Sequence, residues 1–556
     1  MTRLSSTALA MSLILSANAV FAQTTDMLIS NAKIYQHPDA DTLVIAQGNI
    51  VHIGTKHSAA VYKTSTTHMI DAEQAFLMPG FIDNHNHVFE AASEAGGQCE
   101  LSMSASLQEQ RPYLEACKAQ HTGEGWLMGY GFSLEAILGE HNHDTPLDVI
   151  DSVFPNQPVI LMEQTSHSMW VNSAALAEAG ITSSTPDPQG GRILKDEYSQ
   201  KLNGILLDNA GDQVMEIAWN ALENQFEQSY QGLMNGLEEA ASHGITTIGD
   251  GRLYWKRGWF DVWKQAEKEQ DLTARVSLRP WIYPADPVKP QLDFLKRVHS
   301  NDTSRRLLVN QVKMYSDGIF INGTAKTLAP YLDTYLPNDP YGINYIPPKQ
   351  MKTWLNELDR IGYGAHIHAI GDGAIRESLD AIASVRRQSP HRPYTLTHVE
   401  LVNVKDRSRF KTLDVTADFQ VGSDYVAYHD HQWAQAFLGA TRARALMNLR
   451  ALFNAGANVT LSSDWNVHDI NPLVGIANSV KMGETGLPSV DAAIKAFTIN
   501  AAKSLGISDI TGSIAIGKSA DLVLIDDDIT QLMPNDIAQA TVLMTMLQGE
   551  IVYEAQ

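Results

Sequence analysis

The sequence predicts an α/β fold: a distorted (β/α)8 barrel of the TIM type, with a small β-sandwich domain built from both termini and a long insertion after barrel strand 1. Three observations lead to this prediction. Strand-like and helix-like segments alternate through the middle of the chain, and both ends read as short strands separated by turns. The first two strands of the middle are too far apart for an ordinary connection.

The barrel is expected to occupy residues 79–95 and 231–505. Its strands are expected at eight short apolar segments: 80–87, 244–250, 275–283, 308–316, 363–369, 393–400, 414–420 and 457–464. Helical patterns follow most of them, as in "MKTWLNELDRIG" from Met351 onward. Eight strands that alternate with helices predict a parallel barrel, whose chemistry belongs at the carboxyl ends of its strands.

The two ends of the chain, residues 23–78 and 506–556, alternate apolar and polar positions in short runs such as "MLISNAKIYQ" and "DLVLIDD". Neither end has enough strands to bury a face alone, so we expect them to build one β-sandwich together. Residues 96–230 separate the first two barrel strands. They are expected to form an inserted subdomain over the carboxyl ends of the strands.

Apolar residues make up 44% of the 556 residues, which predicts a chain that folds around a core. The formal charge of −22 argues against nucleic acid as a partner, because a nucleic-acid surface needs a surplus of Lys and Arg. The expected partner is a small molecule, and whether the chain forms a homo-oligomer stays open. The two cysteines, Cys99 and Cys117, could form a disulfide, and their spacing does not decide whether they do.

The first 22 residues are typical of a signal peptide. Arg3 precedes an apolar run too short to span a bilayer, and Val20 and Ala22 stand at the positions that a signal peptidase reads. We therefore expect an exported protein, periplasmic or secreted, that begins at Gln23 and does not stay in a membrane after cleavage.

Side chains that bind metals stand at the ends of five of the expected strands. His85 and His87 are one residue apart, so a β-strand directs both rings to the same side. The ends of strands four, five, six and eight carry further residues of this kind: Lys313, His366, His368, His398 and Asp464. Singly, each has a plainer explanation, such as an ion pair of Lys313 with Asp317 or a loop cap by Asp464. Their joint placement predicts a site.

Another close pair, His141 and His143, lies in a turn-like stretch of the insertion with no strand before it. We interpret this pair as surface residues.

Imidazole and carboxylate ligands suit Zn²⁺, Mn²⁺, Fe²⁺, Co²⁺ or Ni²⁺, and Zn²⁺ is the usual ion for hydrolysis. We expect one or two ions, held by six residues: His85, His87 and Asp464 on the first, His368 and His398 on the second, and Lys313 between them. Burial can lower the pKa of a lysine, and the neutral amine could capture carbon dioxide as a bridging carbamate. If Lys313 stays unmodified, a single ion and another division of the histidines are the alternative.

Five motifs carry a family resemblance: "PGFIDNHNH", "KMYSDG", "HIHAIGDGA", "LTHVEL" and "LSSDWNV". Their combination resembles the amidohydrolase superfamily of metal-dependent hydrolases, and within it the amidohydrolase-3 family, whose members include N-substituted formamide deformylase-like enzymes. The tail "GSIAIGKSADLVLID" is similar to that family too. The resemblance implies a TIM-like barrel, a β-sandwich from both termini, and a one- or two-metal site in which carbamylated Lys313 is the bridging ligand.

The function expected from these residues is hydrolysis of a non-peptide C–N bond in an amide, an N-acyl or N-formyl compound, or a cyclic amide, by a metal-bound hydroxide. Asp464 is the expected catalytic residue, which takes the proton from the nucleophile and passes it to the departing nitrogen. A ring deaminase, an ester or lactone hydrolase, and a catalytically inactive periplasmic binding or regulatory protein stay open as alternatives.

Five residues are candidates for substrate contact: His167, Trp170, Tyr315, Asp372 and His468. His167 and Trp170, together with Asn172, could roof the pocket from the insertion, but Trp170 could equally pack inside it. Asp372 could equally cap the helix that follows strand five.

Overall fold

The computed structural model describes residues 25–92, 99–121, 123, 125–139, 144–196, 199–423, 426 and 431–555. The predicted signal peptide and the pair His141 and His143 lie outside the described residues. Among the helices of the described ranges, none has the length and apolar character needed to cross a membrane.

Two parallel sheets form the centre of the molecule, and each of the eight predicted strand segments contains one of their strands. One sheet has the order β15-β14-β13-β7 and the other the order β16-β17-β18-β19-β20. Their strands are β7 (Phe81–Asn86), β13 (Ile245–Asp250), β14 (Arg275–Ser277), β15 (Leu307–Leu308), β16 (Gln311–Tyr315), β17 (Gly364–Ala369), β18 (Tyr394–His398), β19 (Val415–Gln420) and β20 (Asn458–Ser462). A parallel bridge between Trp281 and Lys313 joins the sheets on one side, and β7 lies against β20 on the other.

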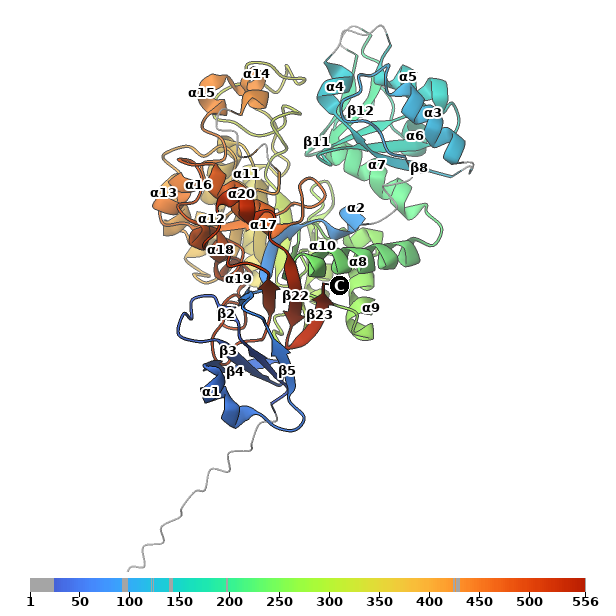
Figure 1. Ribbon diagram of the computed structural model, residues 1–556. Coiled ribbons are helices and arrows are strands. Elements are labelled where there is room, and N and C mark those ends of the chain that lie inside the picture. The colour runs from blue at the N-terminus through green and yellow to red at the C-terminus, as the bar shows by residue number, and fades with distance from the viewer. Residues whose placement is uncertain are drawn as a thin grey trace, which may run out of the picture.

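Helices cover the outside of these strands (Figure 1). The main ones are α8 (Gln225–Ser242), α9 (Trp259–Glu269), α10 (Val288–Val298), α11 (Pro348–Arg360), α12 (Asp372–Arg386), α17 (Pro472–Lys481), α18 (Val490–Ala496) and α19 (Ile499–Leu505). In α11 the buried residues are Met351, Trp354, Leu355 and Leu358, a spacing of three and four that forms one apolar face of a helix. Pro348 occupies the start of α11, where its missing N–H costs nothing.

Strands from both ends of the chain share a sheet. Its order is β2-β6-β21-β22-β23, with β2 (Lys33–Ile34) and β6 (Phe76–Pro79) from the N-terminal part and β21 (Leu522–Ile525), β22 (Val542–Leu547) and β23 (Glu550–Glu554) from the C-terminal part. A second sheet has the order β4-β3-β1-β5, from β1 (Met27–Ser30), β3 (Thr42–Ala46), β4 (Asn49–Gly54) and β5 (His68–Asp71). One apolar cluster contains side chains of both ends, including Leu43, Leu77 and Met546.

The segment between β7 and β13 folds around a five-stranded sheet with the order β11-β12-β10-β9-β8. Its strands are β8 (Leu127–Phe132), β9 (Val159–Glu163), β10 (Ser168–Val171), β11 (Gly191–Lys195) and β12 (Leu202–Asp208), and its helices include α3 (Arg111–Gln120), α5 (Pro146–Val153), α6 (Ser173–Glu178) and α7 (Asn209–Asn220). Figure 1 shows it as a lobe beside the parallel strands. It has an apolar cluster distinct from the main one. Cys99 and Cys117 form a disulfide there, which answers the question that their spacing left open.

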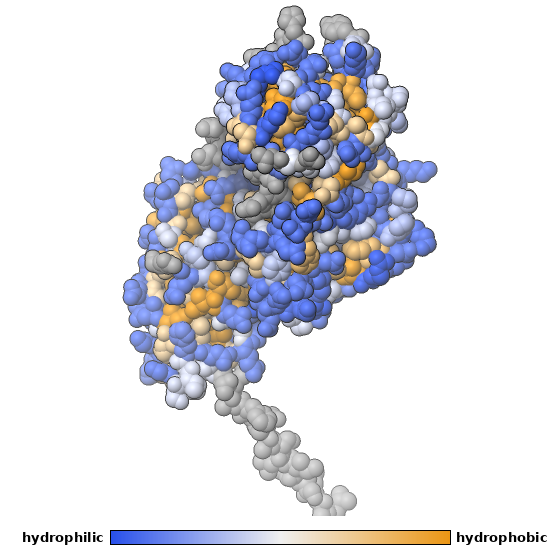
Figure 2. All heavy atoms as spheres, turned by 90° about the vertical axis from the view of Figure 1, so that its right-hand side faces the viewer, coloured by the Kyte–Doolittle hydropathy of each residue, from blue (hydrophilic) through white to orange (hydrophobic). Residues whose placement is uncertain are grey.

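Hydrophilic side chains cover most of the face in Figure 2, over both this lobe and the body of the molecule, while apolar residues form smaller patches. Such a surface suits a chain with a formal charge of −22, because like charges keep the folded molecules apart in solution.

Candidate metal centre

The strand register brings the predicted residues to two successive levels of the parallel sheets. Alternation along β7 directs His85 and His87 to one side, and the same holds for His366 and His368 on β17. In the pairing of β16 with β17, Lys313 stands beside His366 and Tyr315 beside His368. Six of these side chains therefore meet in a buried cluster: His85, His87, Lys313, His366, His368 and Tyr315.

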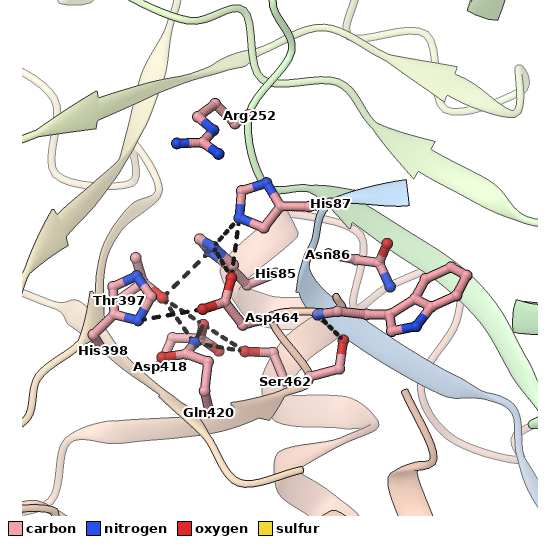
Figure 3. Close-up of polar contacts among 12 residues, drawn as sticks. His85, Asn86, His87, Arg252, Thr397, His398, Asp418, Gln420, Ser462 and Asp464 are labelled. Atoms are coloured by element: carbon pink, nitrogen blue, oxygen red, sulfur yellow. Dashed lines mark hydrogen bonds and ion pairs between the residues drawn. The ribbon is translucent and has the colours of Figure 1, made fainter. Parts of the chain in front are cut away.

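Three donor atoms converge at the end of β7 (Figure 3). Nε2 of His85 lies 3.1 Å from Nε2 of His87, and Oδ1 of Asp464 lies 3.1 Å from the former and 3.0 Å from the latter. Donor atoms that share one ion at bond lengths of about 2.0–2.2 Å lie about 3 Å or slightly more from one another. Two imidazoles and a carboxylate at this spacing therefore fit a divalent ion by both their geometry and their chemistry.

Backbone contacts fix these donors relative to one another. The Asp464 N–H donates to the His85 carbonyl at 2.8 Å, and the His87 N–H donates to the Trp465 carbonyl at 2.8 Å. Asp83 is buried beneath them and accepts hydrogen bonds from the backbone N–H and the hydroxyl of Ser463. Burial raises the pKa of Asp83 to about 6, and the Ser463 hydroxyl opposes that rise. These hydrogen bonds hold the end of β7 and the segment after β20 against each other.

His398 and His368 extend the cluster. Nδ1 of His398 lies 3.9 Å from Oδ2 of Asp464, and its ring centre lies 4.4 Å from that of His368. Nδ1 of His368 is 3.3 Å from Asp317 without hydrogen-bond geometry, so both of its ring nitrogens lack a hydrogen-bond partner among the described residues. His398 and Asp464 have φ values of 73° and 58°, in the left-handed region that few non-glycine residues adopt, although His and Asp do so more often than most. The surrounding structure holds both residues in this conformation, as is common at functional sites.

Lys313 is fully buried, with Nζ 3.3 Å from each ring nitrogen of His85. Burial lowers its pKa well below the usual value for a lysine. The plainer alternative, a pair with Asp317, is not what the structure has. Asp317 instead accepts backbone N–H groups of Lys326, Ile370 and Gly371.

The rings of the cluster are held neutral, which leaves lone pairs for a metal. Burial is the leading cause that lowers the pKa of each one well below its usual value: His85, His366, His368 and His398. For Asp464, burial alone would raise the pKa, but its contacts with His85 and His87 hold it well below the usual value, so it is a carboxylate.

Two residues near the site have no role in the prediction from the sequence. His366 stands at the end of strand five in the sequence but was not assigned as a ligand, and its Nε2 lies 2.7 Å from Nδ1 of His85. Asp418, on β19, accepts hydrogen bonds from Thr397, Thr460, Ser462 and other neighbours, several of which Figure 3 shows. His366 could have been found from the sequence, because it lies two residues before His368 on the same strand and so points to the same side. Asp418 had no motif around it.

The insertion contributes to the wall of the site. His167 stacks over Tyr315 with ring centres 5.4 Å apart and lies 5.2 Å from the His368 ring. Its Nδ1 is 2.7 Å from Oδ1 of Asp208, a residue that sequence reasoning missed. The guanidinium of Arg252 donates to the Tyr315 hydroxyl at 3.1 Å. His167 and Tyr315 are thus placed beside the predicted ligands.

The structure does not bring all pocket candidates to the site. The indole of Trp170 donates to the Pro146 carbonyl at 2.9 Å and packs on Phe132, so this side chain belongs to the core of the insertion. Asn172 caps α6.

Asp372 is the first residue of α12, and its carboxylate accepts the Leu328 N–H, which makes it an anchor for a loop. His468 is buried, and its Nδ1 lies 2.7 Å from the Ser423 hydroxyl. Burial lowers the pKa of His468 below its usual value, and the charge of Asp464 opposes this shift, so this candidate stays near the site.

Comparisons with known proteins give the family. The profile of the amidohydrolase family matches residues 68–553. The chain is similar to the protein LONG AFTER FAR-RED 3 of Arabidopsis thaliana, with 29% identity over 95% of this chain and 91% of that protein. It is also similar to N-substituted formamide deformylase of Arthrobacter pascens, with 25% identity over 96% of this chain and 99% of that protein.

Among solved structures, an uncharacterized metal-dependent hydrolase from Pyrococcus horikoshii shares the fold, with a TM-score of 0.71, 20% identity, and coverage of 92% of this chain and 99% of that one. The chain belongs to the amidohydrolase family, and it is a hydrolase that acts on carbon–nitrogen bonds other than peptide bonds, as its strand-end motifs predict.

Proposed function

We propose that this protein is an exported amidohydrolase that cleaves an amide, an N-acyl or N-formyl compound, or a cyclic amide. The observation that carries the proposal is the convergence of two imidazole nitrogens and one carboxylate oxygen within 3.0–3.1 Å of one another, beside a buried lysine. Burying a carboxylate and lone-pair donors this close together costs free energy unless a cation lies between them.

The metal site that we propose has six ligands: His85, His87, Lys313, His368, His398 and Asp464. A bound divalent ion, with Zn²⁺ the expected one, would supply an activated water and would polarise the scissile carbonyl. The low pKa of Lys313 supports a neutral amine that combines with carbon dioxide to give a carbamate and a proton. That carbamate is the proposed bridge in a two-ion centre.

Asp464 is the proposed proton carrier. Its Oδ1 faces His85 and His87, while its Oδ2 is 3.9 Å from the nearest histidine nitrogen in the described contacts, that of His398. As a carboxylate it can accept the proton of the attacking water at Oδ2 and return it to the departing nitrogen. With this proton, the departing nitrogen leaves as a neutral amine. This one side chain therefore acts first as a base and then as an acid.

Substrate recognition is proposed to involve both the parallel strands and the insertion. Tyr315 stacks on His368 with ring centres 4.2 Å apart, and His167 stacks on Tyr315 from the other lobe. These rings, with the buried His468, offer an apolar wall with polar edges, the usual character of a small-molecule site.

The finer architecture is part of this proposal. We infer that the parallel strands close into the distorted (β/α)8 barrel, supported by the Trp281–Lys313 bridge and by the contact of β7 with β20. The domain boundaries predicted from the sequence are proposed unchanged.

Export to the periplasm is proposed from the first 22 residues. The disulfide between Cys99 and Cys117 supports it, because such bonds persist mainly in oxidising compartments. Cell fractionation and N-terminal sequencing test this part: a periplasmic protein that begins at Gln23 supports it, and a cytoplasmic protein that retains Met1 contradicts it.

A substrate screen tests the activity. The metal-loaded protein is assayed with N-formyl, N-acyl and cyclic amides, with esters, lactones and ring amidines in parallel, and its metal content is measured. We expect about one to two ions per chain and turnover of an amide. The absence of bound metal, or turnover confined to esters or amidines, would contradict the proposal. Lys313→Ala is the control for contaminating activity.

A further inference from the structure

A second layer of polar side chains lies beneath the proposed ligands, and one contact in it is unusually close. Nδ1 of His85 and Nε2 of His366 are 2.7 Å apart, between two fully buried rings. The rings are tilted by 33° with centres 4.9 Å apart. His366 stands two residues before His368 on β17, so both point to the same side of the sheet at successive levels.

The chemistry of imidazole makes this contact directional. A neutral histidine that presents the lone pair of one nitrogen to a metal carries its proton on the other nitrogen. Nε2 of His85 is the atom that faces His87 and Asp464, so its Nδ1 must carry the proton. A buried N–H of this kind needs an acceptor.

Nε2 of His366 is the nearest polar atom to Nδ1 of His85 among its described contacts; as the acceptor, His366 carries its own proton on Nδ1, which has no hydrogen-bond partner among the described residues. The Thr397 hydroxyl oxygen is farther from Nδ1 of His85, at 3.4 Å, and donates its own hydrogen to Asp418. Nζ of Lys313 is 3.3 Å from both ring nitrogens, so it is not aligned with either N–H direction. The short contact to Nε2 of His366 is in hydrogen-bond range.

We propose that His366 is a positioning residue: its Nε2 accepts the Nδ1 proton of His85 and thereby fixes the tautomer and ring orientation in which His85 binds the metal. Metal-bound histidines usually hold this proton with a carboxylate, a backbone carbonyl or water. Here a second imidazole, from β17 in the other parallel sheet, does so. The inference rests on the proposed metal centre.

Another arrangement would make His366 a ligand itself, because His85, His366 and Asp418 offer atoms within 4.8 Å of one another. Asp418 argues against this. Its Oδ1 already accepts from Thr460 at 2.6 Å, and its Oδ2 accepts from Thr397 and Ser462 at 2.9 and 2.8 Å. A carboxylate with both oxygens engaged in this way contributes charge beneath the site rather than a free lone pair for an ion.

The test compares variants of the full chain by their affinity for Zn²⁺. His366→Leu removes the acceptor, whereas His366→Gln keeps an oxygen acceptor on a side chain of similar length. Ile367→Val is the matched control, because Ile367 is buried on the same strand and points to the other side. Metal-free protein is titrated with Zn²⁺ against a chelator of known affinity, and ions per chain are counted at saturation.

We expect His366→Leu to weaken Zn²⁺ binding by about 10–100-fold with an unchanged number of ions at saturation. Glutamine should restore most of the affinity, and Ile367→Val should match the parent. With Co²⁺ in place of Zn²⁺, the visible absorption bands should shift in the leucine variant and return in the glutamine variant.

Three results would overturn the inference: a leucine variant that binds as tightly as the parent, one that loses an ion at saturation, or a glutamine variant no better than leucine. Thermal unfolding of the metal-free proteins checks folding, and His366→Ala replaces the leucine variant if that one does not fold. A parent protein that binds no Zn²⁺ would instead contradict the proposed metal centre itself.

Discussion

Asp464 places Oδ1 against His85 and His87 and leaves Oδ2 for the proposed proton transfer, so a substitution there separates its two proposed roles. Asparagine keeps the shape and one oxygen for the ligand position, but it cannot accept a proton as a carboxylate does. We expect Asp464→Asn to lower kcat by about 10²–10⁴-fold, the usual contribution of a general acid–base. The metal content should fall far less. Steady-state kinetics and metal analysis of the same preparation check this, and near-normal turnover with metal bound would refute the role.

Lys313 offers a second test at the residue scale. Its amine lies 3.3 Å from both nitrogens of His85, inside the proposed ligand set. Lys313→Ala removes the proposed bridge, so we expect the variant to hold fewer ions per chain than the parent and to lose turnover. Lys326→Ala is the matched control, because this lysine lies in the loop after β16, where its backbone N–H contacts Asp317. Equal metal content in the parent and in Lys313→Ala would exclude a ligand role for the lysine.

Particular residues show what the sequence could and could not predict about the site. His85 and His87 follow from strand alternation alone, and Asp464 follows from its place after the last strand of the series. Asp208 could not be found in this way, because it becomes a partner of His167 only when β10 and β12 pair. Trp170 was ambiguous because the direction of a side chain depends on which face of its sheet is buried, and that face is set by distant strands.

At the scale of elements, the apolar segments located the parallel strands, since a strand buried on both faces reads as a short apolar run. The predicted segment 308–316 contains β16 and also the last residue of β15, Leu308, with Val309 and Asn310 between the two strands. Periodicity cannot reveal such a break, because both pieces are buried and each pairs with a different sheet. The order of strands inside the insertion was likewise beyond the sequence, since β12 pairs with β10 as well as with β11, which leaves β11 at the edge although it lies between them in the chain.

At the same scale, the disulfide is expected to stabilise the insertion. It joins Cys99, twelve residues before the start of α3, to Cys117 within α3, at a separation of 18 residues. Closing a loop of that length stabilises a fold by about 3 kcal/mol in the chain-entropy estimate. We therefore expect the double variant Cys99→Ser/Cys117→Ser to lower the free energy of unfolding of the insertion by about that amount. Both cysteines are changed together so that no free thiol remains.

Chemical unfolding followed by tryptophan fluorescence provides the measurement, since Trp170 reports from the core of the same lobe. The parent protein treated with a reductant should unfold at the same denaturant concentration as the double variant. If the variant and the oxidised parent unfold together, the disulfide adds nothing to the stability of this lobe.

At the scale of the whole molecule, the proposed ligands come from β7, β16, β17, β18 and the segment after β20, so they belong to both parallel sheets. Ions bound by this set of ligands tie these sheets together and bind the folded chain in preference to the unfolded one. Free ligand at a hundred times its dissociation constant stabilises a fold by about 2.7 kcal/mol. We therefore expect the unfolding temperature to rise with Zn²⁺ concentration above that of the metal-free protein.

Differential scanning calorimetry at increasing Zn²⁺ concentrations measures this rise, with Mg²⁺ as a comparison ion that prefers oxygen ligands. His85→Ala should abolish the rise, because His85 contacts His87, Lys313 and Asp464 together. His121→Ala changes a histidine of the insertion outside the cluster and should leave the rise intact. An unfolding temperature that is the same in chelator and in excess Zn²⁺ would mean that these strands converge without holding an ion, and the catalytic proposal would lose its physical basis.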